Sequence, residues 1–153
     1  MVLRYRFDSY HPVKKKLIIK YKMIRIGSYV ICIDTTGVHM VKIFKSNVPC
    51  YNKQVHLGET VLVVVRAVNP RVRFLKDERI KFKFRRGSIH RAVVVHTIEK
   101  YKRANRSYIW FPKNAVVLVN RARNPFSKRL RLGIPREIAN KYSTIGSIAP
   151  RIY

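Results

Sequence analysis

Short apolar runs separated by turn-forming residues make up most of the chain between residues 29 and 119. Runs rich in valine, isoleucine and aromatic residues are typical of β-strands, and glycine, proline, asparagine and aspartate are typical of the turns between them. We therefore expect strands at 29–33, 38–44, 60–68, 89–98, 108–111 and 115–119. Asp-Thr-Thr-Gly at 34–37 predicts a turn, so that 29–44 forms a hairpin. At 81–85 cations alternate with phenylalanines, which places the phenylalanines on one face of an extended segment.

After residue 120 the pattern changes. Residues 121–131 are strongly cationic and predict an extended loop. Residues 135–142 predict a short helix, because a proline suits its first position and Ile138 and Tyr142 lie four residues apart on one face. A second helical turn is expected at 144–149. Short strands with turn signals, and helix only at the end, favour a mainly β fold, a small closed β-barrel, over a βαβ sheet.

The balance of charge points to the partner. The 153 residues include 34 lysines and arginines but only 7 acids, which gives a formal net charge of +27, while 47% of the residues are hydrophobic. That apolar fraction is typical of a folded domain and excludes a disordered basic tail. Charge of one sign destabilises a compact chain unless a polyanion neutralises it, so we expect a nucleic acid as partner. No apolar run is long enough to cross a membrane, and two cysteines do not make a disulfide scaffold.

The cations gather in four segments, and the acids are too few to pair with them internally. A single cationic run is often only a solvated face, but four runs in one small domain favour contact with phosphates. The segments are Arg71, Arg73, Lys76, Arg79 and Lys81; Lys83, Arg85, Arg86 and Arg91; Lys100, Lys102, Arg103 and Arg106; and Arg121, Arg123, Lys128, Arg129 and Arg131.

Aromatic residues lie among these cations, namely Tyr101, Tyr108, Trp110 and Phe126. Aromatic rings beside cations suit stacking on unpaired bases together with phosphate contact. For Trp110 and Phe111 the alternative is at least as well supported, namely that these rings belong to the barrel core or cap its ends. Folded RNA is favoured over duplex DNA, because the sequence contains no helix-turn-helix, zinc finger or other groove-reading helix.

Catalytic chemistry has little support. Acid–base catalysis needs a carboxylate or histidine placed beside a partner, but Asp34 and Glu59 lie at turns and Glu137 in the first turn of the expected helix. The five histidines lack zinc-ligand spacing, and His90 and His96 would lie about 20 Å apart on one extended strand. There is no glycine-rich phosphate loop. We therefore expect no enzymatic activity, no catalytic residue, no metal and no cofactor.

Short motifs along the chain, in their order and spacing, resemble those of a known family. They are Met-Ile at 23–24, Asp-Thr-Thr-Gly at 34–37, Gly-Glu-Thr-Val at 58–61, Asn-Pro-Arg at 69–71, Arg-Gly at 86–87, Arg-Ala-Val-Val-Val at 91–95, Asn-Ala-Val-Val-Leu-Val-Asn at 114–120, Arg-Glu-Ile at 136–138 and Ser-Ile-Ala-Pro at 147–150. From residue 23 to residue 153 the chain resembles the universal large-subunit ribosomal proteins of the L-fourteen family, in their bacterial or organellar form.

The resemblance implies a five-stranded β-barrel with a C-terminal loop and small helices that binds large-subunit rRNA. It also implies partners: large-subunit ribosomal proteins three and nineteen, small-subunit rRNA at a bridge, and a ribosome silencing factor on the C-terminal loop. The family's Pro-Ile-Gly-Thr-Arg in that loop corresponds to Pro-Phe-Ser-Lys-Arg at 125–129. Lys128 and Arg129, with Arg131 after them, are therefore expected at the subunit interface.

These observations predict three parts: a basic N-terminal extension (1–22), an rRNA-binding barrel (23–120), and a C-terminal loop with short helices (121–153). The extension has no counterpart in the family and the charge exceeds that of its usual bacterial members. Both features favour a large mitochondrial ribosomal subunit in the matrix over the bacterial cytoplasm or a plastid. The alternatives are a soluble factor that binds single strands through an oligonucleotide-binding type of barrel, and an RNA-acting enzyme, for which no residue is nominated.

Overall fold

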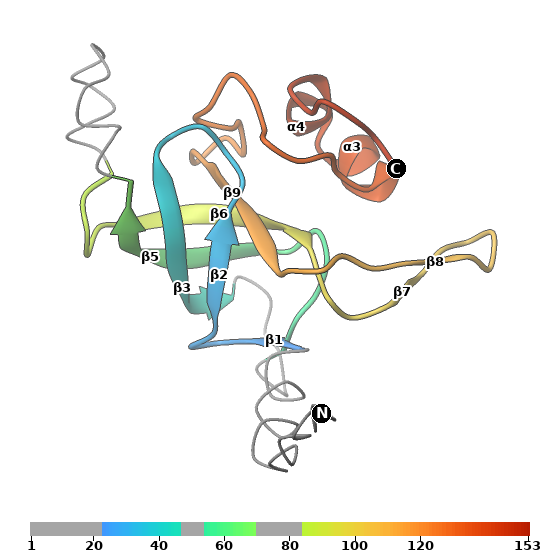
Figure 1. The fold of residues 1–153 in the computed structure, drawn as a ribbon, viewed down its shortest axis with the longest axis horizontal. Helices are drawn as coiled ribbons and strands as arrows, with labels where there is room; N and C mark the ends of the chain where they lie inside the picture. Colours follow the sequence, from blue (N-terminus) through green and yellow to red (C-terminus); the bar gives the residue numbers. More distant parts are fainter. Residues whose placement is uncertain (1–22, 47–53, 70–83) are drawn as a thin grey trace, which may run out of the picture.

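The structure is a computed structural model that describes residues 23–46, 54–69 and 84–153. Its centre is a closed barrel of five strands in the order β2-β3-β5-β6-β9 (Figure 1). Neighbouring strands are antiparallel except β2 and β9, whose parallel pairing closes the barrel. The strands are β2 (Tyr29–Cys32), β3 (Val38–Ser46), β5 (Thr60–Val68), β6 (Ile89–His96) and β9 (Ala115–Val119). This confirms the expected mainly β fold and its closed five-stranded barrel.

Alternate positions of each strand fill the barrel interior, because successive side chains of a strand point to opposite faces. On β5 the inward positions are Val61, Val63 and Val65, all at most 1% exposed. The other strands contribute branched and small side chains to the same interior core: Val30, Cys32, Val38, Val41, Ile43, Ala92, Val94, Val116 and Leu118. Burying a valine or isoleucine contributes about 1.5–3 kcal/mol relative to leaving it in water.

Strands β6 and β9 are buried on both faces because the C-terminal segment covers their outer side. Val93, Val95, Val117 and Val119 point away from the interior and form a second core with the C-terminal segment. This core includes Ile134, Ile138, Tyr142 and Ile145. Ile138 and Ile145 lie on α3 (Arg136–Lys141) and α4 (Ser143–Ser147), two short helices outside the barrel (Figure 1). The two short helices expected at 135–142 and 144–149 are confirmed.

A two-stranded arm extends away from the barrel (Figure 1). It consists of β7 (Tyr101–Lys102) and β8 (Tyr108–Ile109), paired antiparallel. The sequence predicted a strand at 108–111 and a loop at 100–106. The observed strand ends at residue 109 and its partner lies within the expected loop, because an exposed two-residue pair leaves little apolar signal in the sequence. We name residues 100–109 the arm.

Two further strands, β1 (Ile24–Arg25) and β4 (Gln54–Val55), pair outside the barrel. Ile24 and Val55 are buried and belong to the interior core. The alternating segment expected at 81–85 falls mostly on residues 81–83, which lie outside the described residues. Phe84 is described and is buried, as the alternation predicts.

The hairpin expected at 29–44 forms, and its turn is organised by a buried carboxylate. Asp34 has no exposed surface and accepts hydrogen bonds from the main-chain N–H and the hydroxyl of Thr36. Its second oxygen accepts the N–H of Leu118 on β9 at 3.1 Å. Gly37, with φ of 89°, supplies the left-handed conformation that the turn requires. The turn position foreseen for Asp34 is correct, and the carboxylate also joins the turn to the strand beside it.

Candidate nucleic-acid interface

Three aromatic rings hold two cationic turns together at one end of the barrel. The Phe84 ring lies 4.7 Å from that of His90 and 5.3 Å from that of Phe126, measured between centroids. Phe84 directly precedes the turn at 85–88, and Phe126 directly follows the loop at 120–125. Phe84 belongs to the interior core and Phe126 packs against it. The hydrophobic core therefore fixes the positions of both turns.

The first turn presents two arginines. Ser88 closes it, since its N–H and its hydroxyl both donate to the carbonyl oxygen of Arg85, at 3.0 and 2.7 Å. Gly87 adopts a φ of 89° at its tip. The Arg85 and Arg86 side chains are exposed. The turn therefore fixes the backbone from which both guanidinium groups reach solvent.

The second turn presents Arg121 and Arg123, both exposed. Asn120 closes it: its N–H donates to the carbonyl of Asn124, and its side-chain oxygen accepts the N–H of Asn124, both at 2.9 Å. Arg123 has a φ of 63°, a left-handed conformation that costs a non-glycine residue about 1–2 kcal/mol. The hydrogen bonds of the asparagines stabilise that conformation.

A hollow of about 390 Å³ lies between β6 and this second turn, and we name it the arginine hollow. Arg91 on β6 and Arg121 stand at its wall, and both are exposed. The rest of its lining is formed by Leu62, Ile89, His90, Val119, Asn120 and Phe126, with no acidic residue among them. A guanidinium group offers a planar fork of donors that matches two phosphate oxygens. The hollow is therefore suited to a phosphate group of a nucleic-acid backbone.

Five exposed arginines lie on these two turns and on β6 beside them, and we name them together the barrel-end patch. Its members are Arg85, Arg86, Arg91, Arg121 and Arg123. They come from two segments that are separate in the sequence, and the aromatic contacts unite them. The structure thus brings together part of the second and part of the fourth cationic segment.

The third cationic segment lies on the arm, at the opposite end of β6. Lys100, Lys102 and Arg106 are exposed there. Arg103 differs, because its Nε lies 2.7 Å from a carboxylate oxygen of Glu137 and its guanidinium donates to the main-chain oxygen of Tyr153 at 2.7 Å. Arg103 therefore fastens the arm to α3. That Arg103 also contacts RNA stays a prediction, and the carboxylate of Glu137 already balances part of its charge.

The loop at 125–131 presents the residues expected at the subunit interface. Lys128, Arg129 and Arg131 are exposed, while the neighbouring Ser127 and Leu130 are buried. The N–H of Arg131 donates to the carbonyl of Ile33 at 2.8 Å, and that of Leu130 donates to Ile148 at 3.2 Å. The loop is therefore held against the hairpin turn and the C-terminal segment, with its cations facing solvent. Their role at a subunit interface remains a prediction.

The first cationic segment and Lys83 cannot be placed. Arg71, Arg73, Lys76, Arg79, Lys81 and Lys83 all lie outside the described residues.

Among the aromatic residues that were expected beside the cations, Phe126 is half-buried, whereas Trp110 is 57% exposed and so is not a core residue. Tyr101 and Tyr108 on the arm are exposed as well. Three aromatic side chains thus remain accessible beside cations.

The titratable groups whose pKa departs from its ordinary value are buried. Burial, reinforced by the neighbouring Asp34, raises the pKa of the Cys32 thiol. Burial lowers the pKa of His96, although its hydrogen bond to the Gly133 carbonyl acts in the opposite direction. Both side chains are at most 5% exposed. The described residues include no cluster of three or more histidine, cysteine, aspartate or glutamate side chains that could hold a metal ion.

None of the helices in the described ranges is long and apolar enough to cross a membrane.

Comparison with known proteins agrees with the geometry. Residues 23–153 match the family model described as ribosomal protein L14p/L23e. The chain belongs to this family. It is also 32% identical over 132 residues to the large ribosomal subunit protein uL14 of Aquifex aeolicus (strain VF5), an alignment that covers 85% of this chain and 99% of that protein. The resemblance inferred from the sequence motifs is thus confirmed.

The match to the L14p/L23e family begins at residue 23, directly before β1. It includes the barrel, the arm and the C-terminal helices, and it leaves out residues 1–22. The motif analysis identified the cationic segments of the arm and of the barrel-end patch. It missed the contact of Arg103 with Glu137 and a pocket at the base of the arm, because both depend on chain segments that lie far apart in the sequence.

Proposed function

We propose that this chain is a non-enzymatic structural component of the large ribosomal subunit and that it binds rRNA through its cationic turns. The observation that carries the proposal is the barrel-end patch. Two of its five exposed arginines, Arg91 and Arg121, line a hollow without acidic lining. The ring contacts of Phe84 with His90 and Phe126 position the two turns that carry the other three. The chain that presents them belongs to a ribosomal protein family. The rRNA and the neighbouring proteins of the subunit are its proposed partners.

The proposed mechanism is passive. A rigid barrel carries arginines in fixed positions, so that little conformational entropy is lost when they contact phosphates. Each neutralised phosphate releases counterions, which drives binding and makes it depend on salt. The barrel-end patch and the arm lie at opposite ends of β6. The five residue-to-residue steps from Arg91 to His96 span about 17 Å of extended strand, so one molecule can contact two RNA segments at once.

The test is the salt dependence of binding to in vitro transcribed large-subunit rRNA. If the cations neutralise about eight phosphates, the slope of log K against log salt concentration is about −6 to −7. The double variant Arg91→Gln/Arg121→Gln is expected to make this slope shallower by about 1.5, since two phosphate contacts are lost.

The matched control is Arg25→Gln/Arg136→Gln, which removes the same charge from exposed positions on β1 and α3. We expect it to change the slope by less than half as much. A slope near zero for the native chain, or equal changes in both double variants, would contradict phosphate binding at the barrel-end patch.

We also propose that Lys128 and Arg129, with Arg131, lie at the interface between the subunits and contact small-subunit rRNA. The proposal is supported by their exposure on a loop whose backbone is anchored to the hairpin turn. Lys128→Glu/Arg129→Glu should impair joining of the subunits more than assembly of the large subunit, measured by sedimentation of each population. Normal joining would remove both residues from the interface.

The individual protein partners and the cellular compartment are proposals as well. Large-subunit proteins three and nineteen are proposed neighbours, a ribosome silencing factor is proposed to dock on the C-terminal loop, and the mitochondrial matrix is the proposed compartment. Residues 1–22, which precede the family match, support an organellar ribosome. Cosedimentation with mitochondrial large subunits through a salt wash tests this proposal. Early release by salt would instead favour the soluble single-strand-binding factor.

A further inference from the structure

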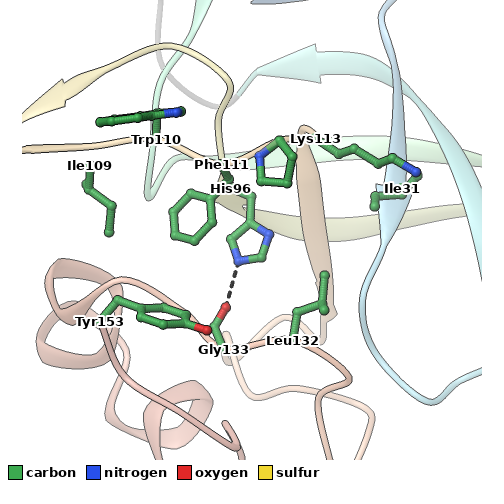
Figure 2. Close-up of a pocket in the computed structure, with 10 residues that line it drawn as sticks. Ile31, His96, Ile109, Trp110, Phe111, Lys113, Leu132, Gly133 and Tyr153 are labelled. Carbon is green, nitrogen blue, oxygen red and sulfur yellow. Dashed lines mark hydrogen bonds between the residues drawn. The ribbon is translucent and has the colours of Figure 1, made fainter.

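An apolar pocket of about 430 Å³ lies at the base of the arm, where the arm meets β2 and the C-terminal segment (Figure 2). Its principal lining side chains are Ile31, His96, Trp110, Phe111, Leu132 and Tyr153. Most of this lining is apolar or aromatic, and no acidic residue contributes to it. We name it the Trp110 pocket.

The Trp110 ring is exposed in spite of its size. It is 57% exposed, and Figure 2 shows it above the pocket, with Phe111, His96 and Tyr153 on the side below it. The ammonium group of Lys100, which does not line the pocket, lies over the ring at 5.3 Å from its centroid. A cation beside an accessible ring is the combination that binds a base together with its phosphate.

The floor of the pocket is held rigidly, so the pocket does not close by side-chain collapse. The rings of His96 and Phe111 are stacked with centroids 3.9 Å apart and planes 12° apart. Nε2 of His96 donates to the carbonyl of Gly133 at 2.7 Å. Gly133 packs so tightly that a Cβ there would lie 2.6 Å from a ring carbon of Tyr153. These contacts fix the positions of His96, Phe111, Gly133 and Tyr153, which together line the open space.

We propose that the Trp110 pocket binds one unstacked RNA base, which stacks on Trp110. A base offers a flat apolar π-face, which suits an aromatic wall, and unstacked bases of folded RNA are commonly held in this way. The chain's net charge of +27 and the lysines at the rim, Lys100 and Lys113, favour a base attached to a phosphate chain over an apolar side chain of a protein. The inference rests on the proposed binding of rRNA and adds to it a site that reads an unpaired nucleotide.

The first test uses Trp110 as its own reporter, since the chain contains a single tryptophan. The full chain is titrated with a 12-nucleotide oligoadenylate, and separately with inorganic polyphosphate of equal charge, which has no bases. Stacking predicts that saturating oligoadenylate quenches at least half of the fluorescence, and that polyphosphate quenches less than a tenth. Equal quenching by both polyanions, or oligoadenylate binding without quenching, would overturn the base site.

The second test separates stacking from phosphate contact. Trp110→Leu keeps the apolar bulk but has no π-face, and it should weaken binding of the labelled oligoadenylate by between about fivefold and a hundredfold. Trp110→Phe should remain within about threefold of the native affinity, because it retains an aromatic ring. Binding of a 12-base-pair RNA duplex, which offers no unstacked base, should stay unchanged in both variants. Phe44→Leu, at a ring on β3 that is 59% exposed and outside the Trp110 pocket, is the matched control.

The outcomes distinguish this site from the proposed function. If the native chain binds rRNA with the predicted salt slope but Trp110→Leu binds oligoadenylate unchanged, the base site fails while rRNA binding stands. If neither RNA binds, both fail. Ultraviolet cross-linking of the assembled particle adds a direct readout: a nucleotide on the peptide that contains Trp110 supports the proposal, and a cross-link from that residue to a protein alone refutes it.

Discussion

Asp34→Ala is expected to be among the most damaging single substitutions in the barrel, although it removes only a small polar side chain. Strand β2 leaves the sheet after Cys32, whereas β9 continues beyond the last residue paired with it. Leu118 on β9 is paired with Ala92 of β6 on one side, but its N–H faces the other side, where β2 no longer offers a main-chain acceptor. The carboxylate of Asp34 accepts that N–H at 3.1 Å and replaces the missing main-chain acceptor.

The magnitude follows from the donors that would be left without an acceptor. Asp34 accepts two main-chain N–H groups, from Thr36 and Leu118, and the site has no solvent exposure. An unsatisfied buried donor costs about 1–3 kcal/mol. Part of this loss is offset, because the substitution also removes a carboxylate from a buried site. We therefore expect Asp34→Ala to lower the free energy of unfolding by about 2–4 kcal/mol.

The assay is urea unfolding of the full chain, followed by circular dichroism in about 0.5 M KCl, which screens the net positive charge. With a urea dependence of about 1–3 kcal/mol per molar, the expected loss moves the midpoint by roughly 1 M or more. Thr35→Ala is the control: the residue is exposed in the same turn and donates only a long 3.4 Å hydrogen bond, to the carbonyl of Arg129. It should cost less than about 0.5 kcal/mol.

The same substitution should loosen the loop that carries the proposed interface cations. Asp34 forms a β-bridge with Leu130, and the N–H of Arg131 donates to the carbonyl of Ile33, the residue before the aspartate. Hydrogen exchange at Leu130 and Arg131 should accelerate in Asp34→Ala and not in Thr35→Ala. An Asp34→Ala variant within about 1 kcal/mol of the native stability, or a Thr35→Ala variant equally destabilised, would refute the role assigned to the carboxylate.

Two further predictions concern buried titratable groups. His96 has a pKa lowered by burial, so the unfolded chain takes up a proton at about pH 6.5 before the folded chain does. Stability should therefore fall as the pH is lowered from 7 to 5, and His96→Gln should lose less over that interval in urea unfolding; equal losses would contradict the prediction. Burial raises the pKa of the Cys32 thiol, so in a Cys50→Ser background we expect Cys32 to react with a thiol reagent only at the rate of unfolding; rapid labelling of the native chain would show that the thiol is accessible.

The motifs and the alternation of polar and apolar residues were sufficient to predict most of the fold. Strands at 29–33, 38–44, 60–68, 89–98 and 115–119 lie within a residue or two of those observed. These segments could be predicted because strand periodicity, turn residues and helix-start signals are local properties of the chain. The arm was the exception, since an exposed hairpin with two-residue strands has no apolar face to reveal it.

The candidate site could be predicted only in part. Exposure of Arg91 and Arg121 agrees with their expected availability, but their meeting at one hollow depends on the contacts of Phe84 with His90 and Phe126. The sequence places Phe126 among the rings suited to stacking on a base, whereas in the structure it packs against the interior core. A sequence specifies which side chains are apolar or charged, but not which distant apolar side chain will cover them.

The charge, the strand segments, the two short helices and the membership of a ribosomal protein family follow from the amino-acid sequence, because each is encoded in local composition or in ordered motifs. The folded chain adds that β2 closes the barrel against β9, that Arg103 pairs with Glu137, and that Trp110 lines an open pocket. Each of these contacts joins residues more than 30 positions apart or several segments at once. Such contacts arise from the packing of the whole chain, which the pattern of any one segment does not contain.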